Sequence, residues 1–151
     1  MNTIHTKGYG GLTPTQLVED LKAAGIEAVV DVRRTKSRAF RAYYNSGDRQ
    51  IGITLSMFNY HHASIFGNEF QTEDNDGLEE YSAMLSNPDD NMKMDILVEA
   101  VFAKKLATCF LCAEKHAYVD SKVNCHRVYV AEAVAAKLTE MTGAEWKIVH
   151  L

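Results

Sequence analysis

The residues best suited to chemistry are gathered in one short stretch, residues 108–127. This stretch holds all three cysteines of the chain. A thiol close to an arginine and to a helix N-terminus has its thiolate form favoured, so Cys112 is a candidate nucleophile. Glu114 and His126 lie near it in the sequence and are candidates for proton transfer. Two further residues of the stretch, Cys125 and Arg127, are candidates for ligand binding.

Two secondary-structure elements are expected to position these groups. The apolar run over residues 106–111 predicts a buried strand that ends at Cys112. After a loop over residues 117–124, apolar residues recur every three or four positions, which predicts a helix from Cys125 or His126 to about Met141, with Asn124 as its N-cap. The reactive groups therefore belong at the carboxyl edge of a sheet, where open α/β sheets bind ligands.

A second strand end carries charge. Residues 26–30 form an apolar run that ends at Asp31, and Arg33 and Arg34 follow directly. Arginines after a strand, together with Arg127 in the first turn of a helix, suit a phosphate or carboxylate. Asp31 is a further candidate for proton transfer, because burial beside an arginine tunes a carboxylate. The alternative is structural: Asp31 or Glu114 fixes an arginine in an ion pair.

The stretch from residue 33 to residue 52 is basic, and its interleaved aromatic residues suggest a ligand. Residues 33–49 supply six of the sixteen basic side chains of the chain. Tyr44 can stack on a nucleobase whose phosphate is held nearby. Gly8, in a glycine-rich turn after the first expected strand, allows close approach of the backbone to a ligand. The favoured partner is a phosphate-bearing small molecule or nucleic acid; the alternative is a solvated basic loop paired with the acidic segment 69–99.

Metal binding is the other possibility for the cysteine-rich stretch. Cys112, Cys125 and His126 offer three ligands, and His5 or His150 could supply a fourth. The spacing Cys-x12-Cys-His matches none of the common zinc patterns. Adjacent helical residues also point about 100° apart. The sequence therefore assigns no metal ligand and leaves the cofactor unknown.

The whole pattern predicts one α/β domain over residues 1–151. Strands are expected around Ile4 and over residues 26–30, 58–62, 106–112 and 146–150. Thr13, Pro14 and Gln16 have the types and spacing of a helix N-terminus with a capping box. Strands that alternate with helices favour a mainly parallel sheet of about five strands with helices on both faces.

Composition excludes several classes of protein. Apolar residues make up 46% and charged residues 24% of the chain, which is typical of a globular domain. No apolar run reaches the roughly 20 residues of a membrane span, and the first residues lack the pattern of a signal peptide. The sequence predicts a cytoplasmic protein with no membrane partner and with reduced cysteines.

Several of these motifs resemble one family. Leu-Cys-Ala-Glu followed by Cys-His-Arg is similar to the signature of the domain-of-unknown-function 488 family, small proteins of bacteria, archaea and phages. Further similar pieces occur in the same order, from Thr6-Lys7-Gly8-Tyr9 through Val30-Asp31-Val32-Arg33, Tyr60-His61 and Phe66-Gly67 to the final Val149-His150-Leu151. The resemblance implies an α/β domain and leaves the chemistry to be argued from the residues.

The residues give three hypotheses for the function. The leading one is a small enzyme that acts on a phosphate-bearing ligand, such as a nucleotide or a nucleic-acid end. The first alternative is a non-enzymatic module that binds nucleic acid or protein through residues 33–49. The second alternative is a metal-binding protein that uses cysteine and histidine.

Overall fold

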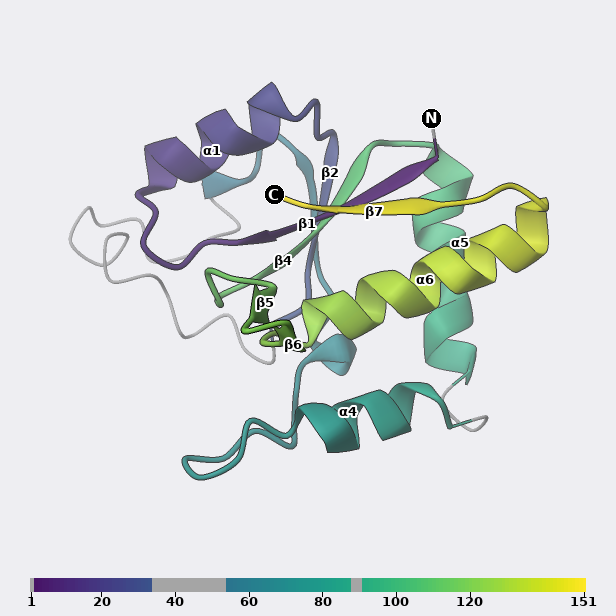
Figure 1. Ribbon diagram of the computed structural model, residues 1–151. Helices are drawn as coiled ribbons and strands as arrows, with labels where there is room; N and C mark the ends of the chain where they lie inside the picture. The colour runs from purple at the N-terminus through teal and green to yellow at the C-terminus, as the bar shows by residue number, and fades with distance from the viewer. Residues whose placement is uncertain (1, 34–53, 88–90) are drawn as a thin grey trace.

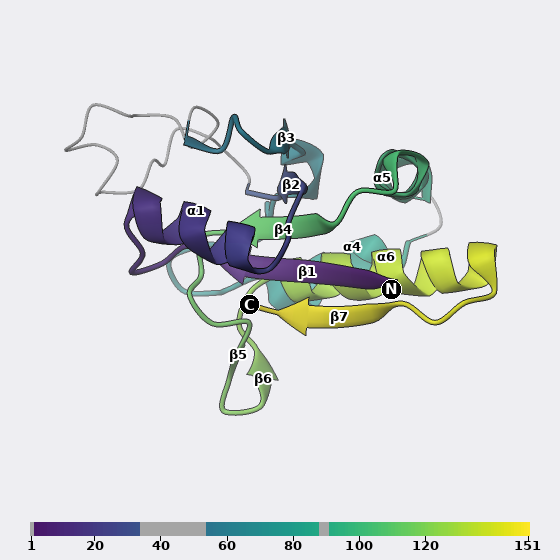
Figure 2. The same ribbon diagram turned by 90° about the horizontal axis from the view of Figure 1, so that it is seen from above.

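A five-stranded parallel sheet forms the centre of the structure, a computed structural model that describes residues 2–33, 54–87 and 91–151. Its strands lie in the order β3 (Asn59–His62), β2 (Ala28–Asp31), β4 (Thr108–Cys112), β1 (Thr3–Gly8) and β7 (Lys147–His150). Figure 1 shows the sheet at the centre of the molecule, and Figure 2 shows the order of the five strands. Each neighbouring pair is parallel. The predicted fold class, a single α/β domain with about five parallel strands, is confirmed.

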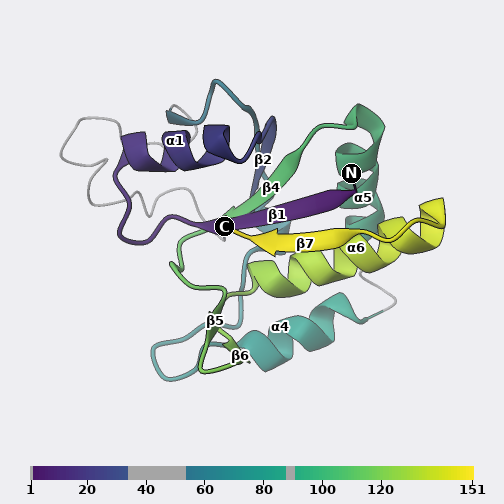
Figure 3. The ribbon, with the colours of Figure 1, turned by 45° about the horizontal axis from the view of Figure 1, so that its top comes forward.

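Helices cover both faces of this sheet. Helix α1 (Pro14–Ala23) lies on one side, and α4 (Leu78–Leu85), α5 (Asn91–Lys104) and α6 (Arg127–Thr142) pack with the other; Figure 3 shows the strands between α1 and α6. Successive residues of a strand face opposite ways. In β4, Phe110 and Cys112 therefore join the core on the α6 side, whereas Cys109 and Leu111 join the core on the α1 side.

Local signals explain where the first helix begins. Thr13 accepts a hydrogen bond from the Gln16 backbone through its side chain, and the Gln16 side chain accepts one from the Thr13 backbone, as the capping box predicts. Pro14 occupies the first helical position, where a missing N–H costs nothing.

The segment before α6 differs from the prediction. The helix begins at Arg127, with His126 at the N-cap and no side-chain cap bond. Asn124 does not cap it, because its side chain donates to the His116 carbonyl instead. The expected loop also contains a small hairpin of β5 (Tyr118–Val119) and β6 (Lys122–Val123), which projects from the sheet in Figure 2.

The turn of this hairpin explains why the sequence predicts only a loop over residues 117–124. Asp120 and Ser121 both have positive φ, 50° and 65°. Positive φ at both positions is the requirement of a type I′ hairpin turn, for which the usual sequence signal is Asn-Gly or Asp-Gly. Asp-Ser carries that signal only weakly.

Among the described residues, no helix combines the length and the apolar character that crossing a bilayer requires.

Candidate active site

A cleft of about 780 Å³ opens at the carboxyl edge of the sheet. Its walls come from segments far apart in the chain: the ends of β1, β2 and β4, the turn before α6, and the segment between η1 (Ser64–Phe66) and α4. The residues that line the cleft and carry reactive or charged groups are Tyr9, Arg33, Glu73, Asp76, Cys112, Glu114, Cys125 and His126.

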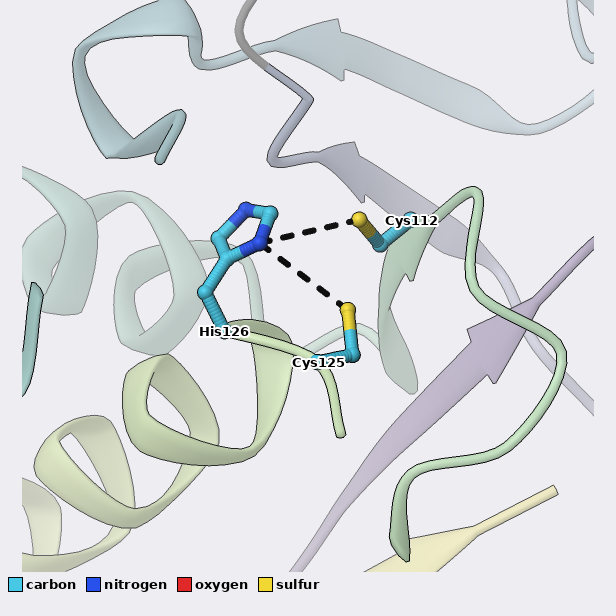
Figure 4. Close-up of side chains that lie close together, drawn as sticks. All are labelled: Cys112, Cys125 and His126. Atoms are coloured by element: carbon cyan, nitrogen blue, oxygen red, sulfur yellow. Dashed lines mark hydrogen bonds between the residues drawn. The ribbon is translucent and has the colours of Figure 1, made fainter. Parts of the chain in front are cut away.

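Cys112, Cys125 and His126 form a cluster in the wall of this cleft (Figure 4). The Cys112 sulfur lies 3.8 Å and the Cys125 sulfur 3.9 Å from Nδ1 of His126. The divergence expected for adjacent helical residues does not arise, because Cys125 and His126 both precede the first helical residue, Arg127. The three side chains can therefore converge because Cys125 and His126 lie in the turn before α6.

The His126 ring is held in one orientation. Its Nε2 lies 2.6 Å from the Val32 carbonyl oxygen, which can only accept a hydrogen bond, so Nε2 carries the proton. In the neutral ring, Nδ1 then presents a lone pair to both sulfurs. The Tyr81 ring contacts His126 edge-on with a centroid separation of 5.0 Å, and its hydroxyl donates to the Phe66 carbonyl.

The sheet register brings Val32 to this histidine. β2 and β4 are neighbours, with Asp31 beside Leu111, and Val32 continues the pairing by donating its N–H to the Leu111 carbonyl. The end of β2 therefore lies next to Cys112. The predicted meeting of the two strand ends beside the Cys-His-Arg turn is observed.

The pKa values of the two thiols in the cluster are shifted in opposite directions. The pKa of Cys112 is lowered by a hydrogen bond with Cys125, by the backbone amides of Ala113 and Glu114 and by the charge of Arg127, which together outweigh burial. The pKa of Cys125 is raised by the hydrogen bond with Cys112 and by burial. Of the two thiols, Cys112 is therefore the one that loses its proton more readily.

Asp31 is saturated by protein partners. Its carboxylate accepts hydrogen bonds from Nε and Nη2 of Arg33, the shortest at 2.6 Å, and from the Tyr60 hydroxyl at 2.6 Å. Asp31 is fully buried and does not line the cleft, whereas Arg33 does. The structure places Asp31 as the partner of Arg33, which is the structural alternative that the sequence left open.

Arg127 and Gly8 lie behind the cleft. Arg127 is fully buried; its Nη1 donates to the Glu114 carbonyl at 2.6 Å and its Nε donates to Thr6 Oγ1 at 3.3 Å. A Cβ at Gly8 would lie 1.5 Å from the same Glu114 oxygen. Neither residue lines the cleft. Their placement fits a role in shaping the strand end, and the charge of Arg127 acts on Cys112.

Glu114 differs from Asp31, because its side chain is exposed and lines the cleft. Arg34 and Tyr44, the other predicted ligand-binding residues, lie outside the described residues, as does most of the basic segment. Sequence reasoning missed the opposite wall, where Glu73 and Asp76 line the cleft although their segment reads as a solvated loop. An acidic loop gives no sequence signal for which surface it faces.

Comparison with known proteins defines the family. The model of the Domain of unknown function DUF488 matches residues 13–134, most of the chain. The chain therefore belongs to the DUF488 family, as its motifs predict. No curated protein and no solved structure matches it.

Proposed function

We propose that the protein is an enzyme that acts on a small phosphate-bearing ligand, such as a nucleotide, and that Cys112 is the reactive group of its active site. The observation that carries the proposal is the Cys112–His126 pair in the wall of the cleft. A thiol of lowered pKa beside an imidazole of fixed tautomer is the arrangement of an activated nucleophile.

Each group of the cluster has a distinct role in this proposal. Cys112 supplies the thiolate, and the lone pair on Nδ1 of His126 accepts a proton from the cluster. Glu114 is the cleft carboxylate that closely follows Cys112 in the chain, and it exchanges protons with the ligand. Two residues that do not line the cleft support these groups. Asp31 holds Arg33 through an ion pair, and the charge of Arg127 stabilises the Cys112 thiolate.

The charges of the cleft support a ligand of mixed polarity. Its volume of about 780 Å³ suits a small molecule. Among the described residues of the lining, Arg33 supplies the cationic side chain, and Glu73 and Asp76 on the opposite wall repel anions and accept hydrogen bonds. A nucleotide fits this division, with its phosphate near Arg33 and its hydroxyl and amino groups toward the carboxylates.

A turnover screen with matched cysteine variants tests the proposal. Nucleoside mono-, di- and triphosphates and a 5′-phosphorylated oligonucleotide are incubated with the protein, and products are followed by phosphorus NMR and chromatography. Cys112→Ser should lower the rate by at least about 100-fold. Cys109→Ala, a fully buried change on the α1 side of the sheet, should retain it. Equal rates in wild type and Cys112→Ser would contradict the proposal.

The binding-module alternative depends on residues 33–49, of which the structure describes only Arg33. No contact of the described residues favours it.

A further inference from the structure

We infer that Cys112, Cys125 and His126 bind a divalent zinc ion whose fourth coordination position opens into the cleft. The inference rests on the proposed function in placing the reaction at this cleft, and it replaces the nucleophile role of Cys112 and the proton-acceptor role of His126 Nδ1 with the roles of metal ligands. It makes the thiolate of Cys112 a metal ligand, and the reacting group becomes the molecule in the fourth position.

The spacing of the three donor atoms is close to that of a tetrahedral zinc site. Zinc binds sulfur at about 2.3 Å and nitrogen at about 2.0–2.1 Å, so tetrahedral angles require a sulfur-to-nitrogen distance of about 3.6 Å. The two distances here are 3.8 and 3.9 Å, and all three donor atoms lie within 4.8 Å of one another. A contraction of a few tenths of an ångström would bring both sulfur-to-nitrogen distances to the tetrahedral value.

The donor chemistry also matches zinc. Two thiolates and one imidazole form a ligand set that suits zinc, whereas magnesium and calcium prefer oxygen donors. Histidines that bind metals usually donate their other N–H to a carbonyl or carboxylate, which fixes the tautomer. His126 already does so, through Nε2 and the Val32 carbonyl at 2.6 Å, and it aims Nδ1 at both sulfurs.

The ligand set is incomplete in a way that exposes the ion to the cleft. Structural zinc sites are closed by four protein ligands, and catalytic sites use three with an open position. Of the residues that the structure describes, three gather here, and each lines the cleft. His150, a fourth ligand suggested by the sequence, is instead bonded through Nδ1 to Thr6 Oγ1 at 2.7 Å. His5 lies on β1 beside Cys109 and is not part of the cluster.

The charges nearby are compatible with this site. Two thiolates offset the charge of the ion, and burial of all three ligands keeps bulk water from competing on the protein side. Glu114 lines the cleft as well, so a carboxylate is available to a water molecule in the fourth position.

Metal analysis of the reduced protein tests the inference without any substrate. Protein is purified with reductant and without chelator, its zinc content is measured by mass spectrometry, and its affinity by competition with a chromophoric chelator. The expected result is about one zinc ion per chain. Cys112→Ser, Cys125→Ser and His126→Gln should each weaken binding by at least about 100-fold. Cys109→Ala, whose thiol faces the other core, should bind zinc as wild type does.

Cobalt substitution of the unmodified chain covers the case in which a ligand variant fails to fold. The expected spectrum has thiolate-to-cobalt charge-transfer absorption and the visible bands of a tetrahedral ion. Zinc content near zero with no chelator-competed binding, or a cobalt spectrum without thiolate bands, would overturn the inference. A Cys112–Cys125 disulfide that persists in reductant would overturn it too.

The two proposals fail separately. If turnover that depends on Cys112 continues in protein free of metal, the zinc inference falls and the enzyme proposal stands. If the cluster binds zinc but the nucleotide panel gives no turnover, the metal site stands and the proposed substrate class falls.

Discussion

Two charged or reactive groups of residues lie at the same edge of the sheet, and they differ in how much of their bonding capacity the protein uses. In the Asp31–Arg33 pair the carboxylate is saturated, because it accepts from the Arg33 guanidinium and from Tyr60; Arg33 itself lines the cleft. In the Cys112–Cys125–His126 cluster, the two sulfurs and His126 Nδ1 contact one another in the wall of the cleft, where a bound ion can replace these contacts. Val32, which lies between Asp31 and Arg33 in the chain, connects the two groups because its carbonyl accepts a hydrogen bond from His126 Nε2.

The difference shows that a polar residue after a core strand is not enough to indicate chemistry. Both groups follow apolar strands and both were candidates from sequence. What distinguishes them is whether neighbouring side chains complete their hydrogen bonds, since a buried group with a full set of partners stabilises the fold and has no bond left for a ligand.

The largest expected effect on stability comes from breaking the saturated pair. Asp31→Asn leaves the buried Arg33 without its counter-charge, which should cost about 3–5 kcal/mol of unfolding free energy. Urea denaturation measures this. Asp20→Asn is the matched control, because it breaks the more exposed Lys7–Asp20 pair and should cost less than about 1 kcal/mol. Equal costs for the two variants would show that the buried pair has no special structural role.

A smaller effect is expected where β1 passes the reactive strand end. Gly8→Ala places a Cβ 1.5 Å from the Glu114 carbonyl, so backbone has to move, at a cost of about 1–3 kcal/mol. Gly10→Ala is the milder comparison, because its Cβ would lie 3.0 Å from the Ala113 carbonyl oxygen, a tight contact that a shift of a few tenths of an ångström relieves. Thermal unfolding should rank the variants in that order. If both behave alike, the close approach of β1 to Glu114 is not what shapes the cleft.

The smallest effect concerns a titratable group that belongs to neither region. Burial lowers the pKa of His5, whose Nδ1 has no hydrogen-bond partner among the residues that the structure describes. Below pH about 6.5 the unfolded chain therefore binds a proton at His5 more readily than the folded protein does. This difference lowers the free energy of unfolding as the pH falls. His5→Asn should reduce the fall in Tm between pH 7 and pH 5 by less than about 2 °C. An unchanged pH dependence would contradict the assignment.

Much of the fold was predictable from local patterns. The capping box at Thr13 and the apolar runs before Asp31 and Cys112 each mark an element that the structure contains. The exact start of α6 was not predictable, because Asn124 is a good cap by type but bonds to His116 in the hairpin loop. Which of several polar groups caps a helix depends on tertiary contacts.

The site was predictable only in part. Motif spacing placed Cys112, Glu114, Cys125 and His126 at one sheet edge, and they line one cleft. Whether a charged residue is saturated depends on partners distant in sequence, such as Tyr60 for Asp31. Glu73 and Asp76 line the opposite wall because of the path that their loop takes in the fold, and this path also depends on contacts distant in sequence.

Anomalous diffraction from crystals of the reduced protein grown with zinc tests the central claim most directly. Data collected on both sides of the zinc absorption edge should show a peak within bonding distance of Cys112 Sγ, Cys125 Sγ and His126 Nδ1, with the fourth direction facing the cleft. No peak at the cluster, or a peak bound only by surface carboxylates, would contradict the account.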